Sequence, residues 1–210
     1  MFVYKFSFIK SYGIPKREVY NMDTAKIEKA VEIFLSAIGE DPTREGLVET
    51  PKRVAKMYAE LLEGIQYTNH DIAEMYNKTF SIDGESSKDM VLVKDISAFS
   101  FCEHHIALMY DMKISIAYIP DKRVLGLSKI ARIANMVCKR LQLQEKISND
   151  IYEVLHEILQ TEDIAIHIEA KHSCMTARGI KNATAVTITN KFSGKFQQID
   201  WQHEFLQSAK

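Results

Sequence analysis

Cys102 and His105, separated by two residues in the segment Cys102-Glu103-His104-His105, are the residues of this chain best suited to chemistry. A thiolate and an imidazole at this spacing can bind one metal ion from a single tight loop. A third soft ligand is available far downstream at Cys174. Three protein ligands leave the fourth position of a zinc ion open, which is typical of catalytic rather than structural zinc. The pattern therefore favours a metal-dependent enzyme.

Two further histidines accompany these ligands. Because His104 and His105 are adjacent, we expect His105 to bind the metal and His104 to act in acid–base chemistry; a supporting or solvent-facing role is the alternative for His104. Strand periodicity over residues 164–174 predicts that His172 and Cys174 emerge side by side if the extended conformation persists. Alone, Cys174 would more often be a small buried apolar residue, but its combination with the first two ligands favours a metal site.

A second group of residues can bind phosphate. A glycine turn leads into a predicted helix with Ser128 as its N-cap and with Lys129 and Arg132 in its first turn. Backbone amides, the positive end of the helix dipole and two cations form an anion site, although a solvated helix surface is the alternative. Arg178, which closely follows the third metal ligand, adds another cation. Metal, histidines and cations together indicate a phosphorylated substrate that is attacked by metal-activated water.

The bulk composition is that of an ordinary globular protein. The chain has 210 residues, of which 46% are hydrophobic and 26% charged, enough to bury a full core. A net charge of −1 gives no global field for nucleic acid or for an anionic membrane, so we expect neither as a partner. An odd number of cysteines, three, favours a reducing, cytoplasmic setting over a disulfide framework. No run approaches the roughly 18 apolar residues of a membrane span.

The elements that must position these residues follow from the hydrophobic pattern. Residues 1–21 are apolar but interrupted by lysines, and we expect them to be a mobile N-terminal extension without catalytic duty. Residues 22–80 are predicted to form an N-terminal helical region, and residues 81–210 the catalytic domain. The predicted helices cover 23–38, 50–65, 69–77, 128–141, 146–160 and 204–207, and the predicted strands cover 91–96, 113–119, 163–171 and 184–189. This order indicates an α+β fold with an antiparallel sheet.

The first two helices carry apolar stripes. The second helix is predicted to begin with Thr50 as its cap and Pro51 at its first position. Arg53 and Lys56 lie together on another part of its surface. The residues predicted to be buried on these two helices include Phe34, Ile38, Val54 and Met57.

The sequence resembles the GTP cyclohydrolase I family. The resemblance rests on five stretches in order, which span most of the chain from Met22 onward. These stretches are Glu49-Thr50-Pro51-Lys52-Arg53-Val54-Ala55-Lys56-Met57-Tyr58, Cys102-Glu103-His104-His105, Gly126-Leu127-Ser128-Lys129, Gln142-Leu143-Gln144-Glu145, and His172-Ser173-Cys174-Met175 with Arg178-Gly179. It implies a tunnelling fold (T-fold) with helices on one face of the sheet, preceded by N-terminal helices. It also implies a homodecamer of two pentamers with active sites between subunits.

The same resemblance implies the reaction. The guanine imidazole ring of GTP would be opened by hydrolysis, C8 released as formate, and the remainder rearranged to 7,8-dihydroneopterin triphosphate, the first step of tetrahydrofolate or pterin biosynthesis. Zinc, activating the water that attacks C8, would be held by Cys102, His105 and Cys174. His172 would protonate the purine, and His104 would transfer protons during ring and ribose opening.

Substrate contacts are also implied by the matching residues. Glu145, at a helix start where a carboxylate also suits the dipole, would grip the guanine edge. The ribose or triphosphate would contact Ser128, Lys129, Arg132 and Arg178, joined by Arg53 and Lys56 of a neighbouring subunit.

One segment departs from the family pattern. The family usually has a proline-aromatic-x-glycine turn after the paired histidines, whereas Ile106–Met112 contains neither proline nor glycine. The run to Gly126 is also one residue longer than usual, which predicts a β-bulge.

Two other functions remain open on the sequence. The protein could be a zinc-stabilised nucleotide-binding or regulatory protein whose altered rim has removed turnover. Alternatively, Cys174 could be a nucleophile activated by His172 without a metal.

Overall fold

The structure is a computed structural model that describes residues 22–82 and 89–209. The expectation for residues 1–21 therefore lies outside the described residues. Within the described ranges, no helix combines the length and the apolar character needed to cross a bilayer.

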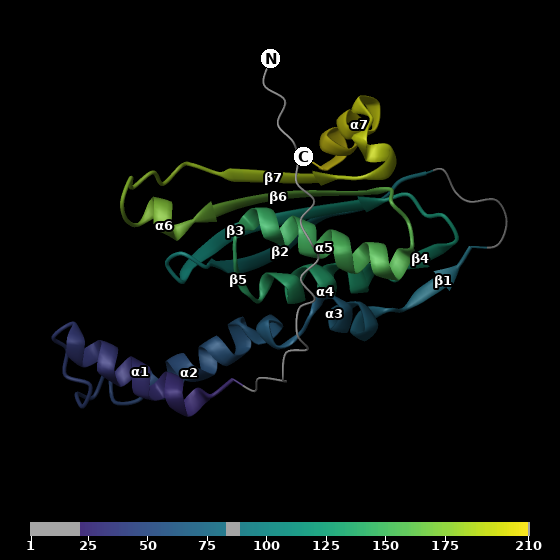
Figure 1. Cartoon of the computed structure of the whole chain (residues 1–210). Coiled ribbons are helices and arrows are strands. Elements are labelled where there is room, and N and C mark those ends of the chain that lie inside the picture. Colours follow the sequence, from purple (N-terminus) through teal and green to yellow (C-terminus); the bar gives the residue numbers. More distant parts are fainter. Residues whose placement is uncertain (1–21, 83–88, 210) are drawn as a thin grey trace, which may run out of the picture.

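Three helices precede the main sheet. Helices α1 (Thr24–Ala37) and α2 (Thr50–Leu61) pack against each other as a pair that extends away from the sheet (Figure 1). A 3-10 turn, η1 (Glu63–Gln66), and α3 (Asn69–Tyr76) then lead back to the body of the molecule. The predicted cap of α2 is wrong by one residue, because Thr50 is already helical and Glu49 occupies the N-cap position. Proline remains in the first turn, where its missing N–H costs nothing.

The sheet has five strands in the order β5-β2-β3-β6-β7. Four of them are antiparallel to their neighbours, as predicted, but β5 runs parallel to β2, so the sheet is mixed. Leu141 was expected at the end of a helix and instead lies in β5, where it pairs with Phe101 of β2. The strands are β2 (Val91–Cys102), β3 (Ala107–Tyr118), β5 (Leu141–Gln142), β6 (Ile164–His172) and β7 (Thr187–Phe192). A separate two-stranded ribbon pairs β1 (Thr79–Ser81) with β4 (Arg123–Leu125).

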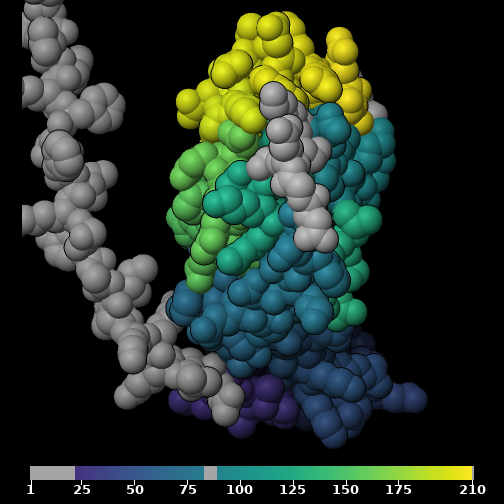
Figure 2. Space-filling view, turned by 90° about the vertical axis from the view of Figure 1, so that its right-hand side faces the viewer, coloured from purple at the N-terminus to yellow at the C-terminus, as the bar shows by residue number. Residues whose placement is uncertain are grey.

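Helices cover both faces of the sheet. Helices α4 (Leu127–Cys138) and α5 (Gln144–Leu159) lie on one face, and together with α3 they enclose the main core. The C-terminal helix α7 (Ile199–Ala209) packs on the other face around Ala117 and Ala165, and Figure 2 shows it at the end of the molecule opposite α1 and α2. The expectation that all helices lie on one face is therefore wrong for α7. Its buried side chains, Phe205 and Ala209, cover a second apolar cluster that includes Ala117 of β3 and Ala165 of β6.

A β-bulge interrupts β3 within the segment Ile106–Met112. Between Tyr110 and Lys113, β3 contains one residue more than β6 opposite it, and the same shift occurs against β2. Asp111 adopts a positive φ of 49° at this point. The predicted bulge is confirmed, and β3 begins at Ala107, six residues before the predicted strand start.

The apolar stripe of the α1–α2 pair is exposed within one chain. Phe34 is 61% and Ile38 58% exposed, and Leu35 is the buried residue of α1. Met57 of α2 is also exposed. The prediction that these stripe residues are buried is wrong for the single chain, because among the described residues α2 is the element against which α1 mainly packs, and it covers one side of α1.

Candidate active site

The three predicted metal ligands converge in the structure. Cys102 is the last residue of β2, His105 lies in the turn between β2 and β3, and Cys174 lies in the short helix α6 (Ser173–Thr176) that follows β6. Their ligand atoms all lie within 4.8 Å of one another, about twice the length of a zinc–sulfur bond of about 2.3 Å. The residues therefore fit a metal with soft and borderline ligands, two sulfurs and one imidazole nitrogen.

The third ligand reaches the site by a different local structure from the predicted one. Strand β6 ends at His172, and the chain turns into α6 instead of continuing extended to Cys174. Two hydrogen bonds attach α6 to β3: Ser173 Oγ donates to the carbonyl of Leu108 (2.7 Å), and Tyr110 Oη donates to Thr176 Oγ1 (3.2 Å). Tyr110 and Ser173 could not be predicted as site residues, since contacts between residues more than 60 positions apart leave no local pattern in the sequence.

The thiol of Cys174 is favoured over its thiolate before a metal binds. Partial burial raises the pKa of Cys174, and the neighbouring Cys102 acts in the same direction. Because a thiolate, and not a thiol, is the metal ligand, metal binding at this site must release protons.

The histidines around the ligands differ in environment. His104 is exposed in the β2–β3 turn, with its ring edge-to-face to that of His105 at a centroid distance of 6.3 Å. His172 is half-buried at the end of β6, and its Nε2 lies 2.8 Å from Oε1 of Gln144. Desolvation lowers the pKa of His172, while the negative charge of Glu145 opposes the shift.

Two of the predicted substrate-binding residues lie beside the ligands. Glu145 occupies the first turn of α5 and is close enough to His172 to influence its charge. Arg178 Nη1 lies 2.5 Å from Nε2 of His105, so the guanidinium donates to the ring of a proposed ligand. The structure thus brings Glu145, His172 and Arg178 together with the metal ligands.

The other predicted anion site lies elsewhere in the chain. Helix α4 starts beside Leu125, whose amide is bonded to Tyr118 Oη, and Tyr118 pairs with Val91 at the far end of the β2–β3 hairpin from Cys102. Ser128, Lys129 and Arg132 occupy its first two turns, so much of a helix of 12 residues, about 18 Å long, separates them from the metal ligands. A single chain therefore does not bring these cations to its own metal site.

Two details of the predicted anion site change. Gly126, and not Ser128, is the N-cap of α4, because the Gly126 carbonyl accepts the first helical bond from the amide of Lys129 (2.7 Å). Arg53 and Lys56 are exposed on α2, in the helix pair that extends away from the sheet.

Two thiols and an imidazole on a sheet rim, with a half-buried histidine alongside, are suited to metal-dependent hydrolysis. Residues 27–210 match the model of the family described as GTP cyclohydrolase I. The chain is 55% identical over 182 residues to GTP cyclohydrolase 1 of Clostridium acetobutylicum, covering 86% of this chain and 93% of the relative. It is 56% identical over 180 residues to GTP cyclohydrolase 1 of Ruminiclostridium cellulolyticum, covering 84% and 92% respectively. The chain belongs to the GTP cyclohydrolase I family and is an enzyme of the hydrolase class.

Proposed function

We propose that this protein hydrolyses GTP to formate and 7,8-dihydroneopterin triphosphate, as the first step of tetrahydrofolate or pterin biosynthesis. The observation that carries the proposal is the convergence of Cys102, His105 and Cys174 to within 4.8 Å in a chain of this family. Most of the segments that carried the resemblance contribute a residue to this site or to the separate cationic helix start.

Zinc is the metal that the three ligands suit best. Two thiolates and one neutral imidazole match its preference for sulfur and nitrogen and leave one tetrahedral position open. Zinc, when bound, lets water act as a nucleophile toward C8 of the purine at neutral pH.

The remaining site residues handle protons and the base. His172 has its Nε2 turned to Gln144, which leaves Nδ1 to hold the proton that is given to the purine ring. Because burial lowers its pKa, the protonated ring gives up this proton readily. His104 transfers protons during ring and ribose opening from its exposed position in the turn. The Glu145 carboxylate accepts two hydrogen bonds from the guanine edge.

The triphosphate is bound between subunits. Arg178 comes from the chain that holds the metal, whereas Ser128, Lys129 and Arg132 lie at the far end of the same chain's sheet. A second copy must therefore supply this group, and Arg53 and Lys56 come from a neighbouring copy as well. This requirement supports a homo-oligomer with shared active sites, which we propose to be a decamer of two pentamers.

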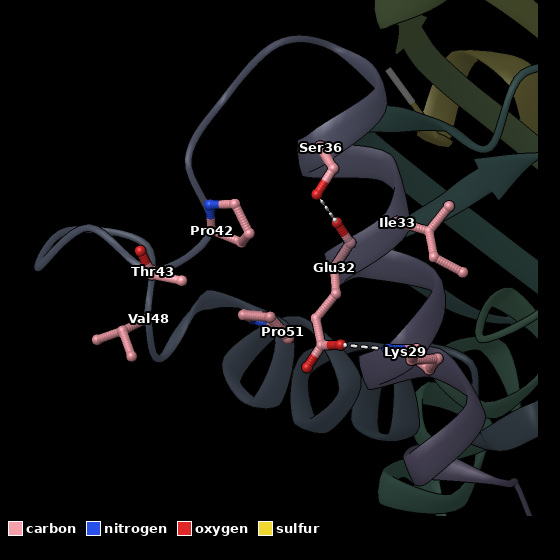
Figure 3. Close-up of a pocket in the computed structure, with 8 residues that line it drawn as sticks. All are labelled: Lys29, Glu32, Ile33, Ser36, Pro42, Thr43, Val48 and Pro51. Atoms are coloured by element: carbon pink, nitrogen blue, oxygen red, sulfur yellow. Dashed lines mark hydrogen bonds and ion pairs between the residues drawn. The ribbon is translucent and has the colours of Figure 1, made fainter.

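The α1–α2 pair offers a surface for such assembly. A groove of about 560 Å³ lies between α1, the following loop and α2, and apolar side chains of Ile33, Val48 and Pro51 line it (Figure 3). Phe34 and Ile38 of α1 are exposed as well, so this part of the chain leaves several apolar side chains available for contact with another copy. The three free cysteines support a reducing, cytoplasmic location.

The proposal is tested by incubating the purified protein with GTP and assaying formate together with the fluorescent oxidised pterin. We expect both products, their loss with a chelator, their recovery with added zinc, and their loss in Cys102→Ser and Cys174→Ser. Cys138→Ser, which alters the cysteine outside the site, is the matched control and should keep activity. Zinc and GTP binding without product would instead indicate the regulatory protein. Activity that survives chelation but not alkylation would indicate a Cys174 nucleophile, which its raised thiol pKa disfavours.

A further inference from the structure

Gln144 is a buried polar residue whose side-chain amide is bonded on both sides. It is the first residue of α5 and only 1% exposed. Its Nε2 faces the carbonyls of Ile168 (3.2 Å) and Thr187 (3.0 Å) and the hydroxyl of Thr189 (3.3 Å). Its Oε1 lies 2.8 Å from Nε2 of His172.

These contacts fix the orientation of the amide. Backbone carbonyls only accept hydrogen bonds, so the NH₂ group of Gln144 must face Ile168 and Thr187. The oxygen is therefore the atom that faces His172, and it can only accept. It follows that Nε2 of His172 carries a hydrogen in the neutral ring and that Nδ1 has the free lone pair.

The amide is also held in place by two strands. Ile168 belongs to β6, the strand that ends in His172, and Thr187 and Thr189 belong to the adjacent β7. The acceptor for His172 is thus anchored to the sheet itself, which gives it a set position before any substrate arrives. An orienting partner of this kind is what keeps a histidine in one tautomer and one ring plane.

We propose that Gln144 is a positioning residue that holds neutral His172 as the Nε2–H tautomer, so that Nδ1 is the nitrogen that takes up a proton and then gives it to the purine. The proposal rests on the proposed function of His172 as the proton donor to the purine. The simpler alternative is that Gln144 only ties the start of α5 to the sheet.

Three variants separate the two roles. Gln144→Met keeps the length of the side chain but removes both the acceptor and the donors. Gln144→Glu keeps an acceptor for His172 but places a carboxylate against two carbonyls, so it should lower the melting temperature more than Gln144→Met does. Thr189→Val removes one partner on the sheet side and leaves His172 untouched.

We expect the three variants to rank differently by kcat than by melting temperature. Gln144→Met should lower kcat about 10- to 100-fold with KM within about threefold, the range seen when partners that orient ligating histidines are removed. Gln144→Glu should keep more of kcat than Gln144→Met despite its lower melting temperature, and Thr189→Val should keep kcat within about twofold. If kcat instead follows the melting temperature across the three variants, Gln144 is only structural and the proposal is overturned.

A spectroscopic measurement tests the tautomer without turnover. Solid-state nitrogen-15 NMR of the histidine-labelled, zinc-loaded protein, with the His172 signal assigned by its loss in His172→Asn, should show the Nε2–H form in the wild type and a mixture in Gln144→Met. A wild type with Nδ1–H at His172 would overturn the inference even if GTP is hydrolysed. If GTP is not hydrolysed but the tautomer shifts as expected, the proposed function fails while the positioning by Gln144 stands.

Discussion

Asp111 and Lys171 form an ion pair, with 2.9 Å between Oδ2 and Nζ, across the bulge in β3. Lys171 directly precedes His172, and it pairs in register with Tyr110. The pair raises the pKa of Lys171 through its hydrogen bond to the Asp111 carboxylate. The bulge, which lies in the segment that departs from the family pattern, is thus attached to the strand that carries a site histidine.

Substitution of Asp111 should separate backbone strain from ion pairing. Its φ of 49° lies in the left-handed region, which costs an alanine about 1–2 kcal/mol relative to glycine, whereas the exposed ion pair contributes little. We therefore expect Asp111→Gly to be more stable than Asp111→Ala by about 1–2 kcal/mol, although both variants lose the ion pair. Urea unfolding measures both. Equal losses in the two variants would show that the backbone conformation is not the main cost.

Tyr110→Phe should weaken metal binding. The Tyr110 hydroxyl bonds to Thr176 and so helps to hold α6, which carries Cys174, against β3. A lost hydrogen bond of about 0.5–1.5 kcal/mol corresponds to a loss of zinc affinity of roughly 2- to 10-fold. Competition with a chromophoric chelator measures it. Tyr152→Phe, which removes a hydrogen bond to Glu162 and to no site residue, is the control and should leave zinc affinity unchanged.

Asp150→Ala should lower the free energy of unfolding of the protein. The Asp150 side chain is 4% exposed and pairs with Arg140, which also donates to the carbonyls of Gly64 and Tyr67 before α3. Removing one partner of a buried ion pair leaves the other charge uncompensated, at a cost of about 3–5 kcal/mol. Chemical denaturation is the measurement. Lys146→Ala removes the more exposed second partner of Asp150 and should cost only about 0–1 kcal/mol; a similar loss in both variants would contradict the central role of Arg140.

The His70–Glu157 contact between α3 and α5 should stabilise the protein only at lower pH. The Glu157 carboxylate, 2.6 Å from His70 Nδ1, raises the pKa of His70 above its usual 6.5, and Glu74 adds a smaller effect. Because the folded pKa is the higher one, the stabilisation is fully present below about pH 6.5 and disappears as pH rises through the folded value. Glu157→Gln should therefore lower the melting temperature slightly at pH 6 and leave it unchanged at pH 8.5. If Glu157→Gln lowered the melting temperature equally at both pH values, the stabilisation could not come from protonated His70.

Phe34→Glu should disrupt the proposed assembly. Phe34 projects an apolar ring into solvent from α1 in the single chain, and a charge there cannot be buried against another copy without a large penalty. We expect a smaller species in sedimentation velocity and loss of GTP hydrolysis, because the cations of α4 then no longer reach a metal site. Lys26→Glu, on the same helix and exposed, is the control and should keep the wild-type mass.

The long elements of the fold could be predicted because their patterns are local. The alternation of Ile164, Ile166 and Ile168 predicts β6, and the spacing of apolar residues predicts α5. The two-residue strand β5 was missed because its pairing with β2 joins residues 40 positions apart. The burial of Phe34 was predicted wrongly because an apolar stripe indicates that a face is covered, but not whether the same chain covers it.

The metal ligands of the candidate site could be predicted from the sequence, but the local structure around them could not. The Cys102–His105 spacing is a local signal, and the structure brings both residues to one point with Cys174. The path of Cys174 through α6 was not predictable, since the bonds from Ser173 and Tyr110 that end β6 involve a distant strand. Ser128 is separated from the metal ligands because of the direction in which α4 crosses the sheet. A local sequence motif does not predict that direction.

Cys138 gives the protein a built-in reporter of its own metal content. It is fully buried in α4 beside Met112, and burial raises its pKa to about 12, so it stays protonated and shielded from thiol reagents at neutral pH. The chain's other two cysteines are Cys102 and Cys174, whose sulfurs a bound metal would mask. A colorimetric thiol count should then read about zero for the loaded protein, about two after the metal is withdrawn and three once the chain is denatured. The number of thiols that react thus measures the fraction of subunits in a preparation that hold the metal.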